Sequence, residues 1–237
     1  MTAVHQVMYG GIKIEFQLER RDRVTLEISV LSDSRVLVVA PELASLDEIS
    51  ARVRKRARWV QSQQRYFAQF APRTPVRRYV PGETHLYLGR QYRLRLQPGE
   101  ERKVRMLRGF IQVEGVDFDD SVSVKRLVTA WYHERAKVQL PRRLEINYAR
   151  FAEPDRFRPI EVRLQRMSSR WGSMSPSGRL LLNPELVRAP VDAIDYVITH
   201  ELCHLAVPNH SRQFYDQQRQ VMPDWEQRKL RLERALA

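Results

Sequence analysis

Five consecutive residues, His200-Glu201-Leu202-Cys203-His204, have the spacing of a zinc-binding motif. Because residues four apart on a helix share a face, both imidazoles can reach one ion. Glu201 lies beside them and can take a proton from water on that ion and later deliver it to a leaving amine. The motif therefore predicts a zinc-dependent hydrolase, with a peptide bond as the expected target.

A third ligand is expected, because a catalytic zinc has three protein ligands and one open position. His210 is the candidate. It follows Pro208, which stops the helix, and Asn209, which tolerates the left-handed conformation of a chain reversal. A developing oxyanion needs a further polar group, and the sequence does not rank the three candidates: Tyr196, Arg170 and Tyr215.

The other side chains of these types are expected to be structural. The helical angle of Cys203 points its thiol away from the two imidazoles, so we expect a small buried residue there. Met222 could mimic a methionine turn below a metal, but its helical spacing favours the core. The remaining histidines are expected at the surface or in structural positions: His5, His85 and His133.

The elements before the motif begin with a small module at residues 1–80. Short alternating or β-branched runs predict an antiparallel sheet from strands at 11–18, 24–30 and 36–40. Ser45 and Glu48 have the spacing of a capping box, which begins a helix that extends to about Phe70. Prolines then predict a linker or turn region at 72–82.

The second module, residues 81–237, combines strands with longer helices. Its first strands are predicted at 86–88, 92–96, 104–107 and 110–113. A helix follows at 122–148, with Pro141 as a break or kink. The runs 160–164 and 179–182 are then expected to pair as a hairpin.

The helix that carries the motif is predicted to begin near Pro190 and to end at Pro208. A last helical region starts at Ser211 and is interrupted near Pro223. We therefore expect an α+β protein, in which a small antiparallel-sheet and helix module precedes a domain built around the motif helix.

The charge of the chain indicates an anionic partner. The formal net charge is +13, and the segment from Ile49 to Gly82 contains no acidic residue, whereas basic residues recur from Arg52 to Arg78. An exposed basic helix face there favours salt-sensitive, sequence-independent binding of nucleic acid. An ordinary solvated helix face remains an equal alternative.

No apolar run approaches the roughly 18 residues of a membrane-spanning helix, and the N-terminus lacks the apolar core of a signal peptide. We therefore expect no membrane association and a cytoplasmic location. The single cysteine excludes an intrachain disulfide, which suits a reducing compartment. The sequence does not indicate an oligomeric state.

Several segments recur together in one known family. They are Ser169-Arg170-Trp171-Gly172-Ser173, Leu182-Asn183, the motif followed by Leu205, Asn209-His210-Ser211 with Phe214, and, earlier, Ala57-Arg58-Trp59-Val60 and Tyr87-Leu88-Gly89-Arg90-Gln91-Tyr92. With these segments the chain resembles the YgjP-like metallopeptidases, a zincin family similar to the SprT and WLM groups. The family commonly has cysteine where this chain has Met174, which argues against an essential ligand at that position.

The resemblance implies zinc ligands at His200, His204 and His210, a catalytic Glu201, and a minimal zincin fold with a sheet edge beside the motif helix. The strand at 179–182 is expected to be that edge, to which an extended peptide substrate could add as a further strand. The similarity to SprT-type proteases, which act on proteins attached to DNA, suggests nucleic-acid-associated proteins as substrates.

Two other interpretations remain open. The chain could be a nucleic-acid-binding adaptor in which the zinc site is structural or vestigial. Glu201 favours an enzyme, because a purely structural site needs ligands but no general base. A hydrolase that acts on a non-peptide bond would use the same site.

Overall fold

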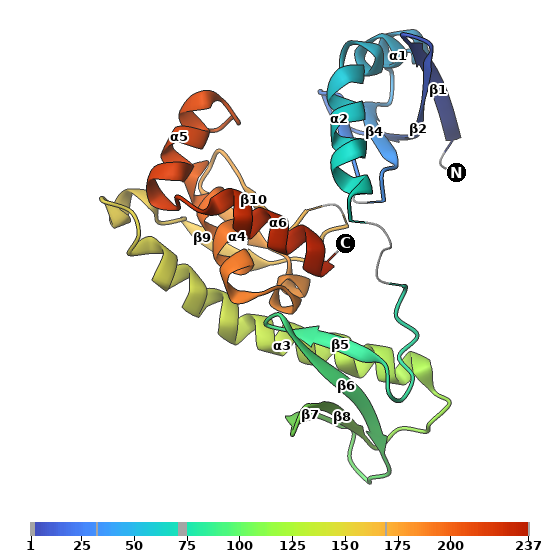
Figure 1. Ribbon diagram of the computed structural model, residues 1–237, viewed down its shortest axis with the longest axis vertical. Helices are drawn as coiled ribbons and strands as arrows, with labels where there is room; N and C mark the ends of the chain where they lie inside the picture. The colour runs from blue at the N-terminus through green and yellow to red at the C-terminus, as the bar shows by residue number, and fades with distance from the viewer. Residues whose placement is uncertain (1–2, 32, 71–74, 169, 237) are drawn as a thin grey trace. The chain divides into compact units, whose positions relative to one another are not determined.

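The structure is a computed structural model that describes residues 3–31, 33–70, 75–168 and 170–236. Ser169 of the motif series and residues 72–74 of the expected linker lie outside these ranges. The chain folds as two compact units, an N-terminal unit within residues 1–74 and a C-terminal unit within residues 75–236 (Figure 1). Both units combine helices with β-sheet, so the expected α+β class is confirmed.

The sheet of the N-terminal unit has the strand order β1-β2-β4-β3. Its strands are β1 (Ala3–Tyr9), β2 (Ile12–Arg21), β3 (Glu27–Val30) and β4 (Val36–Pro41). The expectation of a purely antiparallel sheet is wrong, because β4 returns between β2 and β3 and runs parallel to β2. Strand β1, which sequence patterning missed, pairs with β2 in antiparallel orientation.

Two helices cover the apolar side of this sheet, α1 (Leu46–Lys55) and α2 (Ala57–Ala68), which meet at Arg56. The predicted capping box is confirmed: the Glu48 amide donates to Ser45 Oγ at 3.2 Å, and the Ser45 amide donates to the Glu48 carboxylate at 3.1 Å. The apolar stripe of Ile49, Val53 and Val60 is buried in the same core as the strands. The opposite side of both helices therefore faces solvent.

The C-terminal unit begins with a second mixed sheet of order β5-β6-β8-β7. Its strands are β5 (Thr84–Tyr87), β6 (Arg90–Gln97), β7 (Lys103–Leu107) and β8 (Phe110–Glu114). The long helix α3 (Ser121–Tyr148) follows and runs through Pro141 without the expected break. Buried Leu140 and Leu144 flank the exposed proline, so packing holds the helix together across it.

A third sheet, of order β10-β11-β9, supports the motif helix. The remaining elements are η1 (Pro154–Phe157), β9 (Glu161–Leu164), β10 (Gly172–Met174), β11 (Arg179–Leu182), η2 (Pro184–Arg188), α4 (Val191–Cys203), α5 (Arg212–Val221) and α6 (Trp225–Leu236). The predicted hairpin is wrong, because β9 and β11 run parallel and the intervening segment supplies β10 as the antiparallel partner of β11. Strand β11 is consequently central.

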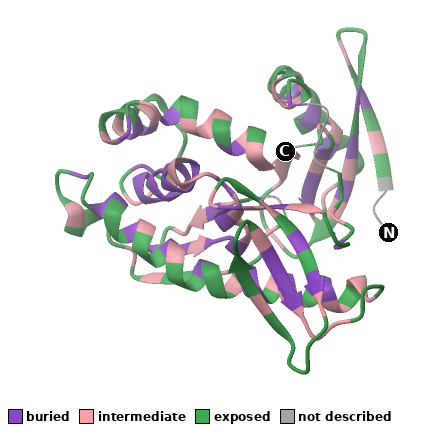
Figure 2. Cartoon of the chain, turned by 60° about the horizontal axis from the view of Figure 1, so that its bottom comes forward, coloured by how far each residue is buried: buried purple, intermediate pink, exposed green. Residues whose placement is uncertain are grey.

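Helix α4, which carries the motif, is almost entirely buried. Buried residues are purple in Figure 2. A buried polar cluster fixes it to α3. Asp195 forms a bidentate ion pair with Arg143 and also accepts from Asn147 Nδ2 at 2.9 Å, and Thr199 donates to Asn147 Oδ1 at 3.1 Å. Among the described residues, no helix has the length and apolar character of a membrane span.

Candidate metal centre

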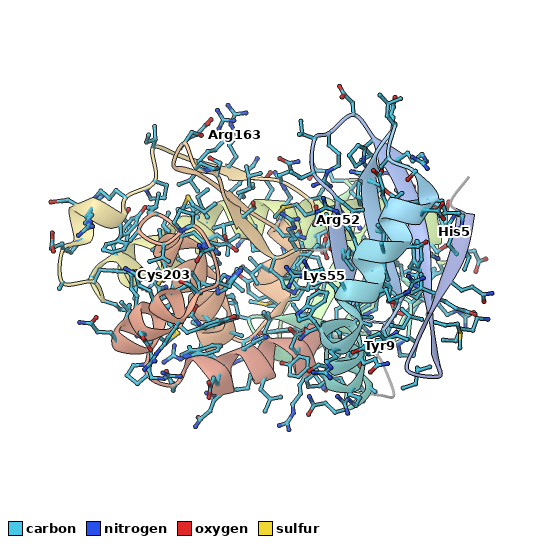
Figure 3. All side chains as sticks on the ribbon, turned by 90° about the horizontal axis from the view of Figure 1, so that it is seen from above. His5, Tyr9, Arg52, Lys55, Arg163 and Cys203 are labelled. Atoms are coloured by element: carbon cyan, nitrogen blue, oxygen red, sulfur yellow. The ribbon has the colours of Figure 1, made fainter. Side chains whose placement is uncertain are left out.

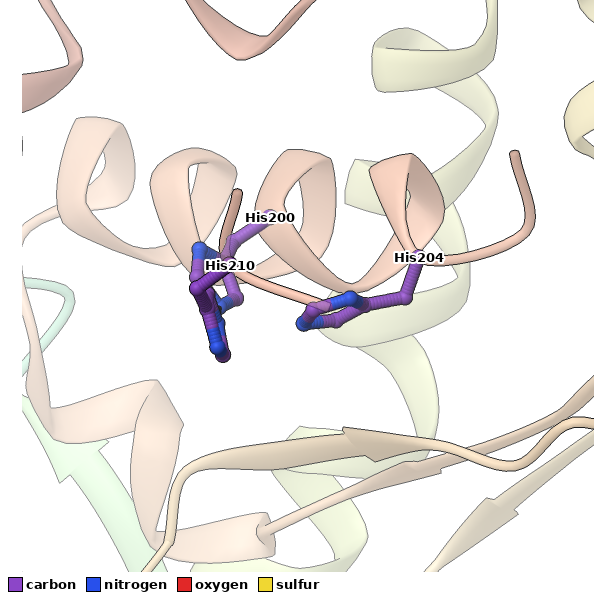
Figure 4. A group of neighbouring side chains, drawn as sticks. All are labelled: His200, His204 and His210. Carbon is purple, nitrogen blue, oxygen red and sulfur yellow. Dashed lines mark hydrogen bonds between the residues drawn. The ribbon is translucent and has the colours of Figure 1, made fainter. Parts of the chain in front are cut away.

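The three histidines that sequence spacing selected converge at the end of α4. His200 lies in the last turn of α4, His204 is its C-cap, and His210 precedes α5. One nitrogen of each ring lies within 4.8 Å of the others, and the Nε2 atoms of His200 and His210 are 3.0 Å apart (Figure 4). The helix ends at Cys203, before the predicted Pro208, and a turn through Ala206 leads to the reversal that returns His210.

Hydrogen bonds on the outer nitrogens orient two of these rings. His200 Nδ1 lies 2.9 Å from the side-chain oxygen of Gln218, and His204 Nδ1 lies 3.1 Å from the carbonyl oxygen of Val207. A ring whose Nδ1 carries the proton and donates to an oxygen presents a bare Nε2 to a metal. Gln218 is fully buried and was missed from the sequence, although its position four residues after Phe214 in α5 places it on the buried face of that helix.

The surroundings keep the three imidazoles neutral. Burial, together with the neighbouring His210 and His204, lowers the pKa of His200 to about 3. Burial also lowers the pKa of His204 and of His210. Because metal ions bind the neutral ring, this set of donors fits zinc, which prefers imidazole nitrogen.

Glu201 lies on α4 next to the cluster and is 7% exposed. Burial raises the pKa of its carboxyl group to about 7, against the opposing effects of the Met174 amide and the Arg170 charge. A carboxyl group with a pKa near neutrality can both accept and return a proton. This environment fits the acid–base role that the motif predicts for Glu201.

Gly172 of β10 provides the space that Glu201 occupies. A Cβ atom at this position would lie 2.7 Å from Glu201 Cγ and 2.8 Å from Glu201 Oε1. Any larger residue would therefore displace the carboxyl group. The sequence places Gly172 within a motif but does not reveal its role, because the role depends on a contact with Glu201, which is distant in the sequence.

A cavity of about 460 Å³ opens over the three-histidine cluster. Its described lining includes Glu201, the three histidines and the residues of β10. Trp171, Tyr196 and Leu232 of α6 also line it. Of the candidate groups for an oxyanion, Arg170 and Tyr196 line this cavity. Tyr215 is not among its described lining residues and instead stacks on Trp225, with ring centroids 5.5 Å apart.

The other residues considered from the sequence lie in the positions expected. Cys203 and Met222 are buried in the core, and burial raises the pKa of the Cys203 thiol to about 12. His85 is buried against Glu83, with Nε2 and the carboxylate 3.0 Å apart. His5 packs near Phe16 in the N-terminal unit, and His133 is a half-exposed residue of α3.

The sheet edge beside α4 is β10, and the expectation of β11 in this role is wrong. The Trp171 carbonyl accepts from the Asn183 amide and the Ser175 amide donates to the Arg179 carbonyl, both at 2.9 Å. Since backbone groups alternate in direction along a strand, the amides and carbonyls of Gly172 and Met174 point away from β11. Both residues line the cavity, and the Met174 amide reaches Glu201.

The chain is similar to a known protein family over most of its length. The family described as "YgjP-like, metallopeptidase domain" matches residues 24–235, which include all of the metal centre and of the cavity lining. No curated protein matches the chain.

Proposed function

The chain belongs to the YgjP-like metallopeptidase family, and on that basis we propose that it is a zinc-dependent peptidase in which His200, His204 and His210 hold the metal and Glu201 is the general base. The convergence of three neutral imidazoles beside a buried carboxyl group with a raised pKa carries this proposal. Zinc-dependent cleavage of a peptide bond needs a metal site and a general base next to each other in one cavity.

When bound, zinc acts as a Lewis acid that makes water nucleophilic near neutral pH. Glu201 takes the proton from the attacking water and delivers it to the amine of the leaving peptide. Gly172 leaves space for this carboxyl group, and the Met174 amide holds it in position. Arg170 or Tyr196, which line the same cavity, would stabilise the oxyanion.

The substrate would lie as an extended peptide along the outer edge of β10. The Gly172 amide and the carbonyls of Gly172 and Met174 point to that side, where a peptide could pair with them as an additional strand, while the Met174 amide remains bonded to Glu201. Recognition by backbone hydrogen bonds depends little on side chains. We therefore expect a preference for unfolded segments rather than for a particular sequence.

A non-enzymatic adaptor with a structural zinc is less well supported. Structural zinc sites have four protein ligands, whereas among the described residues only three side chains of ligand type converge here. The nearby Cys203 is enclosed in the core. A structural site also gives no reason to bury a carboxyl group beside the ligands.

The test compares zinc content and cleavage of an unfolded polypeptide in the Glu201→Gln variant. We expect one zinc per chain, as in the unmodified protein, and loss of cleavage, because the amide cannot accept the proton. Glu153→Gln, which removes an exposed carboxylate outside the cavity, is the matched control and should cleave normally. Cleavage by zinc-loaded Glu201→Gln at the normal rate would refute the mechanism.

A further inference from the structure

Helices α1 and α2 present a row of cations without acidic counterparts. No Asp or Glu occurs between Ile49 and Gly82. Six basic side chains on α1, on α2 and at their junction are exposed, and we call them the basic face: Arg52, Arg54, Lys55, Arg56, Arg58 and Arg65. Figure 3 labels Arg52 and Lys55, which lie on α1.

The charges of the basic face are not neutralised within the described part of the chain. No ion pair joins any of the six to a described acidic residue, whereas elsewhere in the same unit Arg21 pairs with Glu19 at 2.6 Å and Arg23 with Glu27 at 3.1 Å. Among the described residues, the side chain of Arg58 donates one hydrogen bond, from Nε to the hydroxyl of Tyr9 at 3.1 Å, which leaves its charge in place. The face therefore retains its full positive charge.

This arrangement opposes the stability of the helices. Arg52 and Arg56 are four residues apart in the last turn and at the C-cap of α1, a spacing at which like charges repel. The helix dipole favours cations in the last turn of α1, but Arg58 lies in the first turn of α2, where the dipole disfavours a cation. A helix face that is exposed to solvent and binds no partner usually carries charges of both signs. An anionic partner would remove the repulsion.

An exposed aromatic residue lies within this face. Trp59 follows Arg58 in the first turn of α2, is 39% exposed, and stacks on no other aromatic ring of the described residues. Nucleic-acid bases stack on such rings, while phosphates bind neighbouring cations. An anionic membrane fits less well, because the apolar stripe of these helices is buried in the core and is not free to enter a bilayer.

We propose that the basic face binds the phosphate backbone of single-stranded nucleic acid, with Trp59 stacked on a base. The single strand is favoured because its bases are accessible for stacking, whereas in a duplex they are paired inside the helix. No base-edge reading is involved, so binding is independent of sequence. This site requires no metal and is separate from the proposed peptidase reaction.

The test measures binding of a labelled oligodeoxythymidylate to the full-length protein by fluorescence anisotropy over a series of salt concentrations. The triple variant Arg54→Glu, Lys55→Glu, Arg58→Glu should lose binding. A control with the same change in net charge, Arg90→Glu, Arg93→Glu, Arg142→Glu, replaces exposed residues of β6 and α3 and should bind far better than the first variant. This comparison separates the local face from the overall charge.

Two further variants keep the test interpretable if the charge reversal disturbs folding. Replacement of Arg54, Lys55 and Arg58 by glutamine should reduce the slope of log Kobs against log salt by about 2, since each phosphate contact on a single strand contributes about 0.7. Trp59→Ala should weaken single-strand binding by roughly tenfold and leave the salt slope unchanged.

Three results would overturn the proposal. The first is normal binding by a folded glutamate or glutamine variant at low salt. The second is an equal loss in the β6 and α3 control, which would show that only net charge matters. The third is tighter binding to vesicles with phosphatidylserine than to the oligonucleotide. Normal single-strand binding by Trp59→Ala would overturn the stacking part and with it the preference for single strands.

Discussion

Replacing Gly172 by alanine tests whether β10 positions the general base. The added Cβ would lie 2.7 Å from Glu201 Cγ, whereas non-bonded carbons prefer about 3.5 Å, so the carboxyl group must move by about 0.8 Å. Misplacement of a catalytic group by about 1 Å can reduce a rate on the order of 100-fold. We therefore expect kcat/KM for peptide cleavage to fall by about that factor, equivalent to about 2.7 kcal/mol of transition-state stabilisation.

The assay combines kcat/KM on an unfolded polypeptide with zinc content and urea unfolding. Zinc should remain bound, because the added methyl group meets Glu201 and not the imidazoles. Gly99→Ala is the control: its nearest neighbour, Glu114 Cβ, is 3.4 Å away, and its backbone is not left-handed. Full activity in folded, zinc-loaded Gly172→Ala would refute the assigned role of β10.

Three other predictions concern the support of the site and of the C-terminal unit. Gln218→Leu removes the acceptor of the His200 ring and should weaken zinc affinity by about 10- to 100-fold in a chelator competition; unchanged affinity would exclude this role. Asp195→Ala leaves half-buried Arg143 and buried Asn147 without their common partner and should lower the free energy of urea unfolding by about 3 kcal/mol; a near-neutral effect would contradict the importance of the cluster. Burial lowers the pKa of His85 from 6.5 to about 4, so the stability that its neutral form contributes is fully present above pH 6.5 and is lost as the pH falls toward 4. In His85→Gln the free energy of unfolding should therefore decrease less over this pH range than in the unmodified protein. An identical pH profile of the two proteins would contradict this assignment.

The local parts of the site could be predicted because their information lies within a few residues. The i, i+4 spacing of His200 and His204 fixes their common face, and Pro208 with Asn209 indicates the reversal that brings in His210. The Ser45 capping box is local in the same way.

The supporting parts depend on contacts between distant segments and could not be predicted. Gly172 and Gln218 acquire their roles only because β10 and α5 pack beside α4. Strand β10 has three residues, too few to show an alternating pattern, and this led to the wrong hairpin. Pro141 was expected to break or kink α3, but the helix is not broken there, because burial of the neighbouring leucines overrides the local preference.

The most direct test of the central claim is a crystal structure of the zinc-loaded protein with anomalous diffraction measured at the zinc edge. Our account predicts one strong peak about 2.0–2.1 Å from a nitrogen of each of His200, His204 and His210, with the remaining position open to the cavity beside Glu201. A peak elsewhere, or a fourth protein side chain that closes the site, would contradict a catalytic metal centre.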